Sequence, residues 1–168
     1  ILLQAEKSGE KPVLLLLDQL EDPHNLGSLI RTSEALGVHG IIIPQRRSAG
    51  LSAAVAKVAS GALEFIPVAR VTNLCQTMKE LKNKGIWFVG AEATGEKLCH
   101  EIDLNIPLGL VLGSEGYGIR QLIKEECDWL VRIPMYGRIN SLNVAVAGGI
   151  LLYEITKQRK LSKKKSKS

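Results

Sequence analysis

An uncharged run over residues 144–153, which contains the adjacent pair Gly148 and Gly149, constrains this chain more than any other stretch. A helix that is apolar on every face is a buried helix. Each glycine costs about 1 kcal/mol relative to alanine in a helix interior, so close backbone packing is the expected compensation. The run therefore predicts a fully buried helix around which the chain is organised.

The residues before this run predict how the helix begins. Residues 129–133 are apolar with one arginine and are typical of a strand, which Pro134 ends. Ser141 is a good N-cap for a helix over about residues 142–157. The polar loop between strand and helix then lies at the mouth of a buried helix, where ligands commonly bind.

Length and composition are those of one globular domain with a sizeable core, since the chain has 168 residues. No apolar run approaches the ~20 residues of a membrane span, so no membrane partner is expected. The three cysteines show no C-x-x-C spacing, which argues against a disulfide framework and a zinc site. A reducing, cytoplasmic setting without a metal is the simplest interpretation.

The net charge of +5 arises at the C-terminal end of the chain. Residues 157–168 carry six lysines, one arginine and no acidic residue, so the rest of the chain has a net charge of −2. Residues 160–168 are expected to form a disordered basic tail. Such a tail attracts polyanions or merely keeps the chain in solution, and both interpretations stay open.

Strand and helix patterns alternate along the chain, which predicts an α/β fold with a mostly parallel sheet of six strands flanked by helices. The expected strands are residues 13–17, 40–44, 65–71, 86–90, 108–112 and 129–133. The expected helices are residues 26–36 after the N-cap Asn25, residues 51–60, a helix that Thr72 or Asn73 caps and that ends at residue 84, and residues 119–126 and 142–157. Residues 91–106 are expected to be irregular.

Ligands in an open parallel sheet collect beyond the carboxyl ends of the strands. Three polar loops qualify, residues 18–25, 113–118 and 134–143, and the glycine spacing of the second fits neither the dinucleotide fingerprint nor the P-loop. These loops hold no carboxylate pair, Cys–His pair or metal cluster. Their composition indicates a site that positions a polar or anionic substrate and a cofactor. The candidate residues in and beside the loops are Asn25, Arg31, Glu115, Ser141 and Asn143.

Taken together, three segments resemble the motifs of the SpoU family of RNA ribose 2′-O-methyltransferases, in the SPOUT superfamily. They are residues 22–32, 110–119 and 133–147. The resemblance covers about residues 13–159, which would form the methyltransferase domain. The intervening residues look closest to the branch that methylates a guanosine ribose in large-subunit ribosomal RNA. Ala145 stands where the family often has serine, and little effect on the chemistry is expected.

The resemblance also implies a knot, a cofactor and an assembly. The fold would contain a deep C-terminal trefoil knot, and the protein would be a homodimer whose C-terminal helices pack across the interface. S-adenosylmethionine would lie in the knot, held by backbone groups near Gly113, Ile133, Met135 and Leu142. Arg31 would act at the ribose hydroxyl, and the positioning residues would be Asn25, Glu115, Ser141 and Asn143.

Two other functions stay open beside this one. One is a transfer RNA ribose methyltransferase of the same family, and the other is an RNA-binding module without catalysis. Close relatives carry an N-terminal RNA-binding domain, so residues 1–12 would be a lead-in or the remnant of a linker to a missing one. Because the body of the chain is slightly acidic, weak and strongly salt-sensitive RNA binding is expected, which deletion of residues 160–168 would largely remove.

Overall fold

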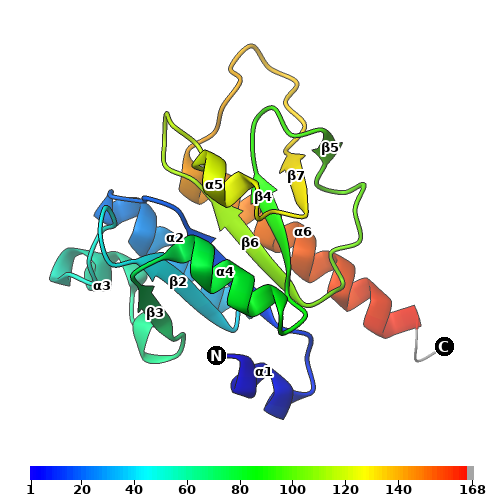
Figure 1. Cartoon of the computed structure of the whole chain (residues 1–168), viewed down its shortest axis with the longest axis horizontal. Helices are drawn as coiled ribbons and strands as arrows, with labels where there is room; N and C mark the ends of the chain where they lie inside the picture. The colour runs from blue at the N-terminus through cyan, green and yellow to red at the C-terminus, as the bar shows by residue number, and fades with distance from the viewer. Residues whose placement is uncertain (166–168) are drawn as a thin grey trace.

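A parallel sheet runs through the middle of the molecule, as the computed structural model shows for residues 1–165 (Figure 1). In the described residues the sheet has seven strands, in the spatial order β3 (Val68–Val71), β2 (Gly40–Pro44), β1 (Val13–Leu17), β6 (Leu108–Leu112), β4 (Trp87–Ala91), β7 (Trp129–Arg132) and β5 (Lys97–Leu98). The predicted α/β class and parallel sheet are confirmed. The predicted number of six strands is wrong, because the two residues of β5 pair with β7 inside a segment expected to be irregular.

The central strands follow directly from their composition. All five residues of β1, β2 and β6 are buried, as expected of strands that helices cover on both faces. These three strands have the predicted bounds. The predicted third strand begins too early, at residue 65, whereas β3 begins at Val68. A short 3₁₀ helix, η1 (Ala62–Glu64), lies before it.

Helices form a layer on each face of the sheet, and Figure 1 shows α4 in front of the strands and α6 behind them. One layer consists of α2 (Pro23–Ala35), α3 (Ala53–Ala59) and α6 (Val144–Lys165), and the other of α1 (Leu2–Ser8), α4 (Leu74–Lys82) and α5 (Gln121–Lys124). Successive strand residues point to opposite faces. Accordingly, Leu15 packs with the first layer and Leu14 and Leu16 with the second.

The caps of the two helices nearest the predicted site differ from the prediction. Asp22 caps α2 and accepts hydrogen bonds from the backbone N–H of His24 and Asn25. Asn143, rather than Ser141, caps α6, because its Oδ1 accepts from Ala145 N at 2.9 Å. Several residue types serve as caps equally well, and the local sequence did not decide between neighbours. The expected cap Asn73 of α4 is confirmed.

Within one chain the helix α6 is buried on one side and exposed on the other, so its predicted burial on every face stays a prediction for the homodimer. Gly148 faces α2 and the sheet, where an added Cβ would lie 2.5 Å from Leu29 Cδ2. On the opposite side, Val146 and Tyr153 are 52% and 61% exposed. The helix also continues to Lys165, so residues 160–165 of the expected disordered tail are helical. Residues 166–168 of that tail lie outside the described residues.

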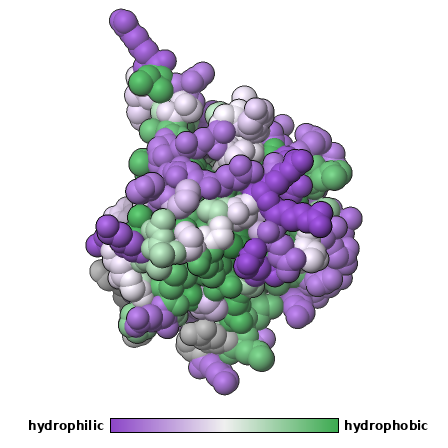
Figure 2. All heavy atoms as spheres, turned by 90° about the vertical axis from the view of Figure 1, so that its left-hand side faces the viewer, coloured by the Kyte–Doolittle hydropathy of each residue, from purple (hydrophilic) through white to green (hydrophobic). Residues whose placement is uncertain are grey.

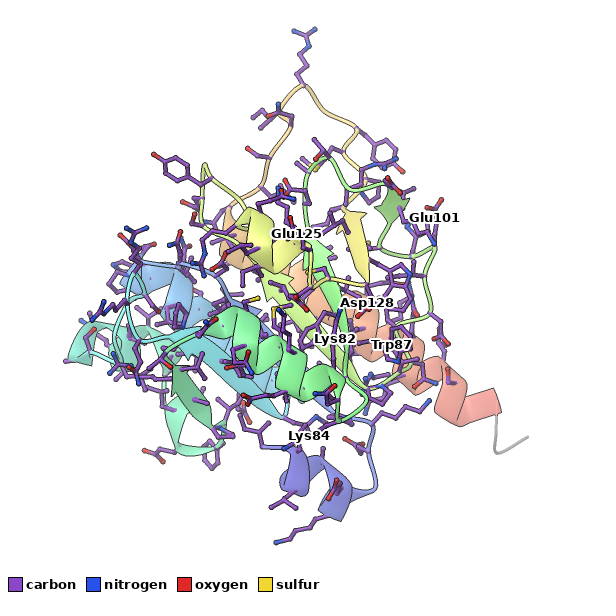
Figure 3. The ribbon with its side chains drawn as sticks, in the orientation of Figure 1. Lys82, Lys84, Trp87, Glu101, Glu125 and Asp128 are labelled. Atoms are coloured by element: carbon purple, nitrogen blue, oxygen red, sulfur yellow. The ribbon has the colours of Figure 1, made fainter. Side chains whose placement is uncertain are left out.

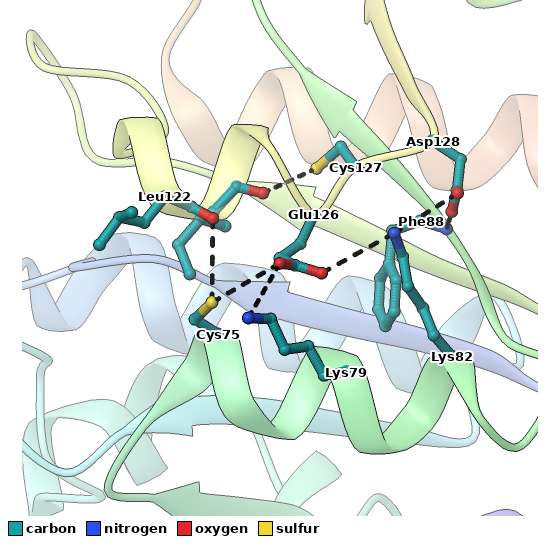
Figure 4. A network of polar contacts seen from close by, with 9 residues as sticks. Cys75, Lys79, Lys82, Phe88, Leu122, Glu126, Cys127 and Asp128 are labelled. Carbon is teal, nitrogen blue, oxygen red and sulfur yellow. Dashed lines mark hydrogen bonds and ion pairs between the residues drawn. The ribbon is translucent and has the colours of Figure 1, made fainter.

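A network of ion pairs holds α4 against the turn between α5 and β7 (Figure 4). The carboxylate of Glu126 lies 3.6 Å from Lys79 Nζ and 3.8 Å from Lys82 Nζ. Lys82 also lies 3.5 Å from Asp128, and both are labelled in Figure 3. Asp128 Oδ2 in turn accepts from Phe88 N of β4 at 2.7 Å. The network ties the second helical layer to the sheet.

The trefoil knot that the family resemblance implies stays a prediction.

Candidate active site

A cavity of about 410 Å³ opens at the carboxyl ends of β6, β4 and β7. The main cavity, as we call it, lies between the loop after β4, the loop 113–118 after β6 and the loop 133–143 that leads into α6. That last loop forms the highest point of Figure 1 and the projection at the top of Figure 2. Its position confirms the expectation that the polar loops meet at this edge of the sheet.

The loop 113–118 is folded so tightly that one glycine admits no side chain. Ser114 and Gly118 exchange two backbone hydrogen bonds of 3.1 and 2.9 Å. A Cβ on Gly113 would lie 2.0 Å from the carbonyl carbon of Gly118. The close approach turns the backbone of this loop toward the main cavity.

A buried ion pair fixes the same loop to β1. Asp18 is fully buried directly after β1. Its Oδ1 lies 2.8 Å from Arg120 Nε and 2.7 Å from Arg120 Nη2, and its Oδ2 accepts from Arg120 N at 2.9 Å. A buried carboxylate needs such compensation for its lost hydration. The pair therefore sets where the loop 113–118 lies relative to the sheet.

Three of the predicted polar residues form one hydrogen-bonded cluster. Asn143 Nδ2 donates to Asn25 Oδ1 at 2.9 Å and to Glu115 Oε1 at 2.6 Å. Glu115 Oε1 also accepts from Val144 N at 3.3 Å, at the beginning of α6. The cluster joins residues more than a hundred positions apart in the sequence, at the rim of the main cavity.

Most of the other predicted residues lie on the wall of this cavity. Of the site residues predicted from the sequence, those that line the main cavity are Gly113, Ile133, Met135, Leu142, Glu115 and Ser141. Arg31 is the exception, because it lines no part of the main cavity and its Nη1 lies 3.4 Å from Ser60 Oγ, beyond α3. Arg31 is also about 9 Å farther along α2 than Asn25, since a helix rises ~1.5 Å per residue.

Sequence reasoning missed two charged residues of the wall. Glu92 follows β4 directly, and its Oε2 lies 2.6 Å from Lys124 Nζ. Arg132 ends β7 and donates to Gly95 O at 2.5 Å and to Glu96 O at 3.1 Å. Both stand at carboxyl ends of strands, but their relevance depends on β4 and β7 being neighbours, which the sequence does not show. Within residues 1–165, the His, Cys, Asp and Glu side chains form no group that is arranged to hold a metal ion.

The model of the SpoU rRNA Methylase family matches residues 12–153 of the chain. The chain belongs to this family. The SpoU motifs named above all lie within the matched range, and the three loops that carry them are the walls of the main cavity and its rim. No helix in the described part of the chain is long and apolar enough to cross a membrane.

Three SpoU relatives illustrate the similarity. The Bacillus subtilis protein YacO, assigned to the TrmH family of tRNA/rRNA methyltransferases, is 54% identical over 155 residues, which are 92% of this chain and 62% of YacO. The structure of AviRb from Streptomyces viridochromogenes with AdoMet has 31% identity and a TM-score of 0.85, over 90% of this chain and 62% of AviRb. The A. aeolicus TrmH/SpoU tRNA modifying enzyme has 29% identity and a TM-score of 0.82, over 96% of this chain and 86% of that one.

The chain thus spans about 62% of the length of YacO and AviRb. The likeness to the solved structures agrees with the α/β fold described above. Two structures with bound AdoMet, those of AviRb and of an rRNA methyltransferase from Sinorhizobium meliloti, have this fold at 31% and 33% identity to the chain.

Proposed function

We propose that the chain binds S-adenosylmethionine in the main cavity and transfers its methyl group to a ribose 2′-hydroxyl of RNA, with a guanosine of large-subunit ribosomal RNA as the first candidate. One observation carries the proposal. All four residues predicted to hold the cofactor line a single cavity, and the Asn25–Asn143–Glu115 cluster stands at its rim. The AdoMet bound to AviRb supports the choice of cofactor.

The main cavity fits this cofactor in size and charge. Its volume of about 410 Å³ lies in the range of small-molecule sites. The loops around it offer backbone groups outside regular secondary structure, and the carboxylates of Glu92 and Glu115 lie on its wall. The Glu115 carboxylate suits a sulfonium or an ammonium group, and the Arg132 guanidinium on the same wall suits the carboxylate of the cofactor.

When bound, S-adenosylmethionine supplies a methyl group on a positively charged sulfur that is a good leaving group. The chain must then align a poorly nucleophilic hydroxyl and manage its proton. We assign the alignment to Asn143, which fixes Asn25 and Glu115 together. Arg31 fixes a phosphate that takes part in proton removal, because arginine itself is not deprotonated in proteins.

Arg31 lies apart from the main cavity of its own subunit, so we propose that it acts from a second subunit. One face of α6 carries Val146, Ile150 and Tyr153, which are each at least 39% exposed. Leu142, which is 38% exposed and precedes the helix by two residues, extends this strip. We propose that this apolar strip is the homodimer interface. α2 also meets α6 at Gly149, where an added Cβ would lie 3.8 Å from Thr32 Cγ2, and Gly149 is next to Ile150 of the strip. We propose that Arg31, the neighbour of Thr32, therefore acts in the partner's site.

Mixing two inactive variants tests the shared site. An Arg31→Ala subunit retains its own cluster, and a Glu115→Ala subunit retains Arg31. Their mixed dimer contains one complete site if Arg31 acts across the interface, so it recovers methyl transfer that neither variant has alone. No recovery in mixtures that demonstrably exchange subunits would place Arg31 in its own subunit's site. A stable monomer in sedimentation would refute the interface.

A transfer RNA substrate is the second candidate function. This chain covers 86% of the length of the A. aeolicus tRNA modifying enzyme, whereas it covers 62% of AviRb. The test is incubation of the chain with methyl-labelled S-adenosylmethionine and either ribosomal or transfer RNA, followed by nuclease digestion and mass spectrometry of the nucleosides. A 2′-O-methylated nucleoside supports the proposal, and its source decides between the candidates. Base methylation, or RNA binding without transfer, would overturn it.

A further inference from the structure

A second cavity of about 390 Å³ adjoins the main cavity. The side cavity, as we call it, lies where the loops after β1, β2 and β6 meet the beginning of α2. Its lining includes Gln19, Asp22, Asn25, Arg47, Glu115 and Tyr117. Glu115 and Tyr117 belong to the walls of both cavities, so the two spaces are separated only by the rim that carries the polar cluster.

The backbone around the side cavity is unusual. In residues 1–165, three residues other than glycine have a left-handed backbone, and two of them, Gln19 with φ 58° and Arg47 with φ 54°, line this cavity. Such conformations are unfavourable for residues with a Cβ and gather at functional sites. A hydrogen bond from Ala49 N to Leu20 O of 2.7 Å holds the two loops together. The cavity is therefore set by the fold.

Two side chains of the side cavity have no role in holding the fold. Arg47 is exposed, and within residues 1–165 its guanidinium makes no hydrogen bond or ion pair. A guanidinium offers a planar pair of donors that matches a phosphate. Tyr117 is 93% exposed, and an exposed aromatic ring is a platform on which a nucleic acid base stacks.

We propose that the side cavity holds the nucleotide whose ribose is methylated. Arg47 binds a phosphate of that nucleotide, Tyr117 stacks on its base, and the ribose lies at the shared rim beside Asn25 and Glu115. The proposal rests on the function proposed above, since the rim is where a hydroxyl in the side cavity faces the main cavity. Two of the carboxylates in this lining are engaged, because Asp22 accepts from His24 N and Asn25 N and Glu115 accepts from Asn143 Nδ2. Glu21 is exposed on the same wall, so Arg47 must hold the phosphate against its charge.

The chain offers matched controls for both side chains. Arg46 is exposed beside Arg47 but does not line the side cavity, and Tyr136 is 95% exposed but lines neither cavity. Asparagine tolerates a left-handed backbone better than most residues. Arg47→Asn therefore removes the guanidinium without straining the loop further, and Arg46→Asn is its control.

The test measures nucleotide binding by the full chain. Binding is monitored through changes in the backbone amide signals of NMR spectra. The probe is guanosine 3′,5′-bisphosphate, added in the presence of saturating S-adenosylhomocysteine. We expect shifts in residues 19–22, 45–48 and 114–117. Loss of a charge-assisted phosphate contact weakens binding about tenfold in Arg47→Asn, with no change in Arg46→Asn. Tyr117→Ala weakens binding similarly, whereas Tyr117→Phe and Tyr136→Ala do not.

Equal affinity of Arg47→Asn and Arg46→Asn, shifts outside these loops, or no shifts at millimolar probe would overturn the proposal. An unchanged affinity of Arg47→Asn and Arg46→Asn for S-adenosylhomocysteine shows that the main cavity is intact, and for Tyr117→Ala, which changes both walls, nucleotide affinity is compared at saturating S-adenosylhomocysteine. Methyl transfer to RNA is measured on the same samples. Transfer that Arg47→Asn leaves unchanged overturns the nucleotide site alone, and Arg47-dependent nucleotide binding without transfer overturns only the methyltransferase function.

Discussion

Cavities open at both ends of the parallel sheet, and the larger one is at the end where no function is proposed. The main cavity at the carboxyl end has about 410 Å³. At the amino end, a cavity of about 570 Å³ lies between β1, the end of α2 and the second half of α6. Volume alone would favour the amino end, so the comparison must be made on the polar groups of the two walls.

The polar groups at the amino end are largely engaged in holding the fold. Arg159 donates to Lys11 O at 2.6 Å, to Pro12 O at 3.3 Å and to Ile106 O at 2.5 Å. Burial lowers the pKa of the Arg159 guanidinium to about 10. His39 Nδ1 accepts from Val13 N at 3.1 Å, and burial lowers the pKa of this imidazole. These side chains stabilise strand ends.

At the carboxyl end, Asp18 and Arg132 also hold the fold, but the side chains of the polar cluster bond to each other. Asn143 binds the side chains of Asn25 and Glu115, and Ser141 is exposed on the same rim. Side chains that the strands do not need remain available to a ligand. The difference teaches that the functional end of a sheet is recognised by polar side chains that the strands do not need, and not by cavity volume.

Gly113→Ala should have the largest effect and abolish binding of S-adenosylmethionine. The added Cβ would lie 2.0 Å from the backbone of Gly118, so the loop 113–118 must move. Gly137→Ala is the matched control, because a Cβ there meets nothing within 4 Å. Calorimetric titration of both variants, with a chelator present, measures the effect. Affinity of Gly113→Ala within a few-fold of the parent would contradict the assignment.

Asn143→Ser should lower the rate of methyl transfer at least about 100-fold, because misplacement of reacting groups by ~1 Å costs that much. Serine still caps α6 but cannot join Asn25 to Glu115. Stability should therefore change little and cofactor affinity only slightly. Single-turnover transfer to RNA with saturating cofactor decides, and a rate close to that of the parent would remove the cluster from the proposed mechanism.

At the amino end, Arg159→Met should destabilise the fold by about 2 kcal/mol without affecting the site, since it leaves carbonyl groups unpaired. Lys160→Met, which changes an exposed residue on the wall of the same cavity, should have little effect. Urea unfolding measures stability, and calorimetry measures cofactor affinity under conditions where both variants are folded. A loss of affinity without a loss of stability would mean that the two ends had been assigned the wrong way round.

His39 should give the smallest effect. Burial lowers its pKa in the folded chain below the ordinary value of about 6.5, so at mildly acidic pH the unfolded chain binds a proton that the folded chain does not. The contribution of this residue to stability is present above that value and is lost as the pH falls below it. His39→Asn should flatten the pH dependence of urea unfolding between neutral pH and about pH 5.5. An unchanged slope would mean that His39 titrates normally.

The sequence predicted the strands that are apolar throughout, because these follow from local pattern. The four residues that the motifs propose for the cofactor line one cavity, and their role stays a prediction. The sequence missed β5, which has only two residues and exists through pairing with β7. The sequence also could not show that Arg31 lies apart from the other polar residues of its own subunit. Both points depend on contacts between distant segments, which local pattern does not encode. The helix caps and the helical residues 160–165 were missed for a local reason, since neighbouring residues there serve a helix about equally well.

Hydrogen–deuterium exchange of the chain with and without S-adenosylmethionine tests most directly which end of the sheet is the active one. Backbone amides at a bound ligand exchange more slowly. The proposed function predicts slower exchange in residues 112–118 and 132–142, with residues 34–39 and 155–160 unchanged. Slower exchange at residues 34–39 and 155–160, with the carboxyl-end loops unaffected, would contradict it.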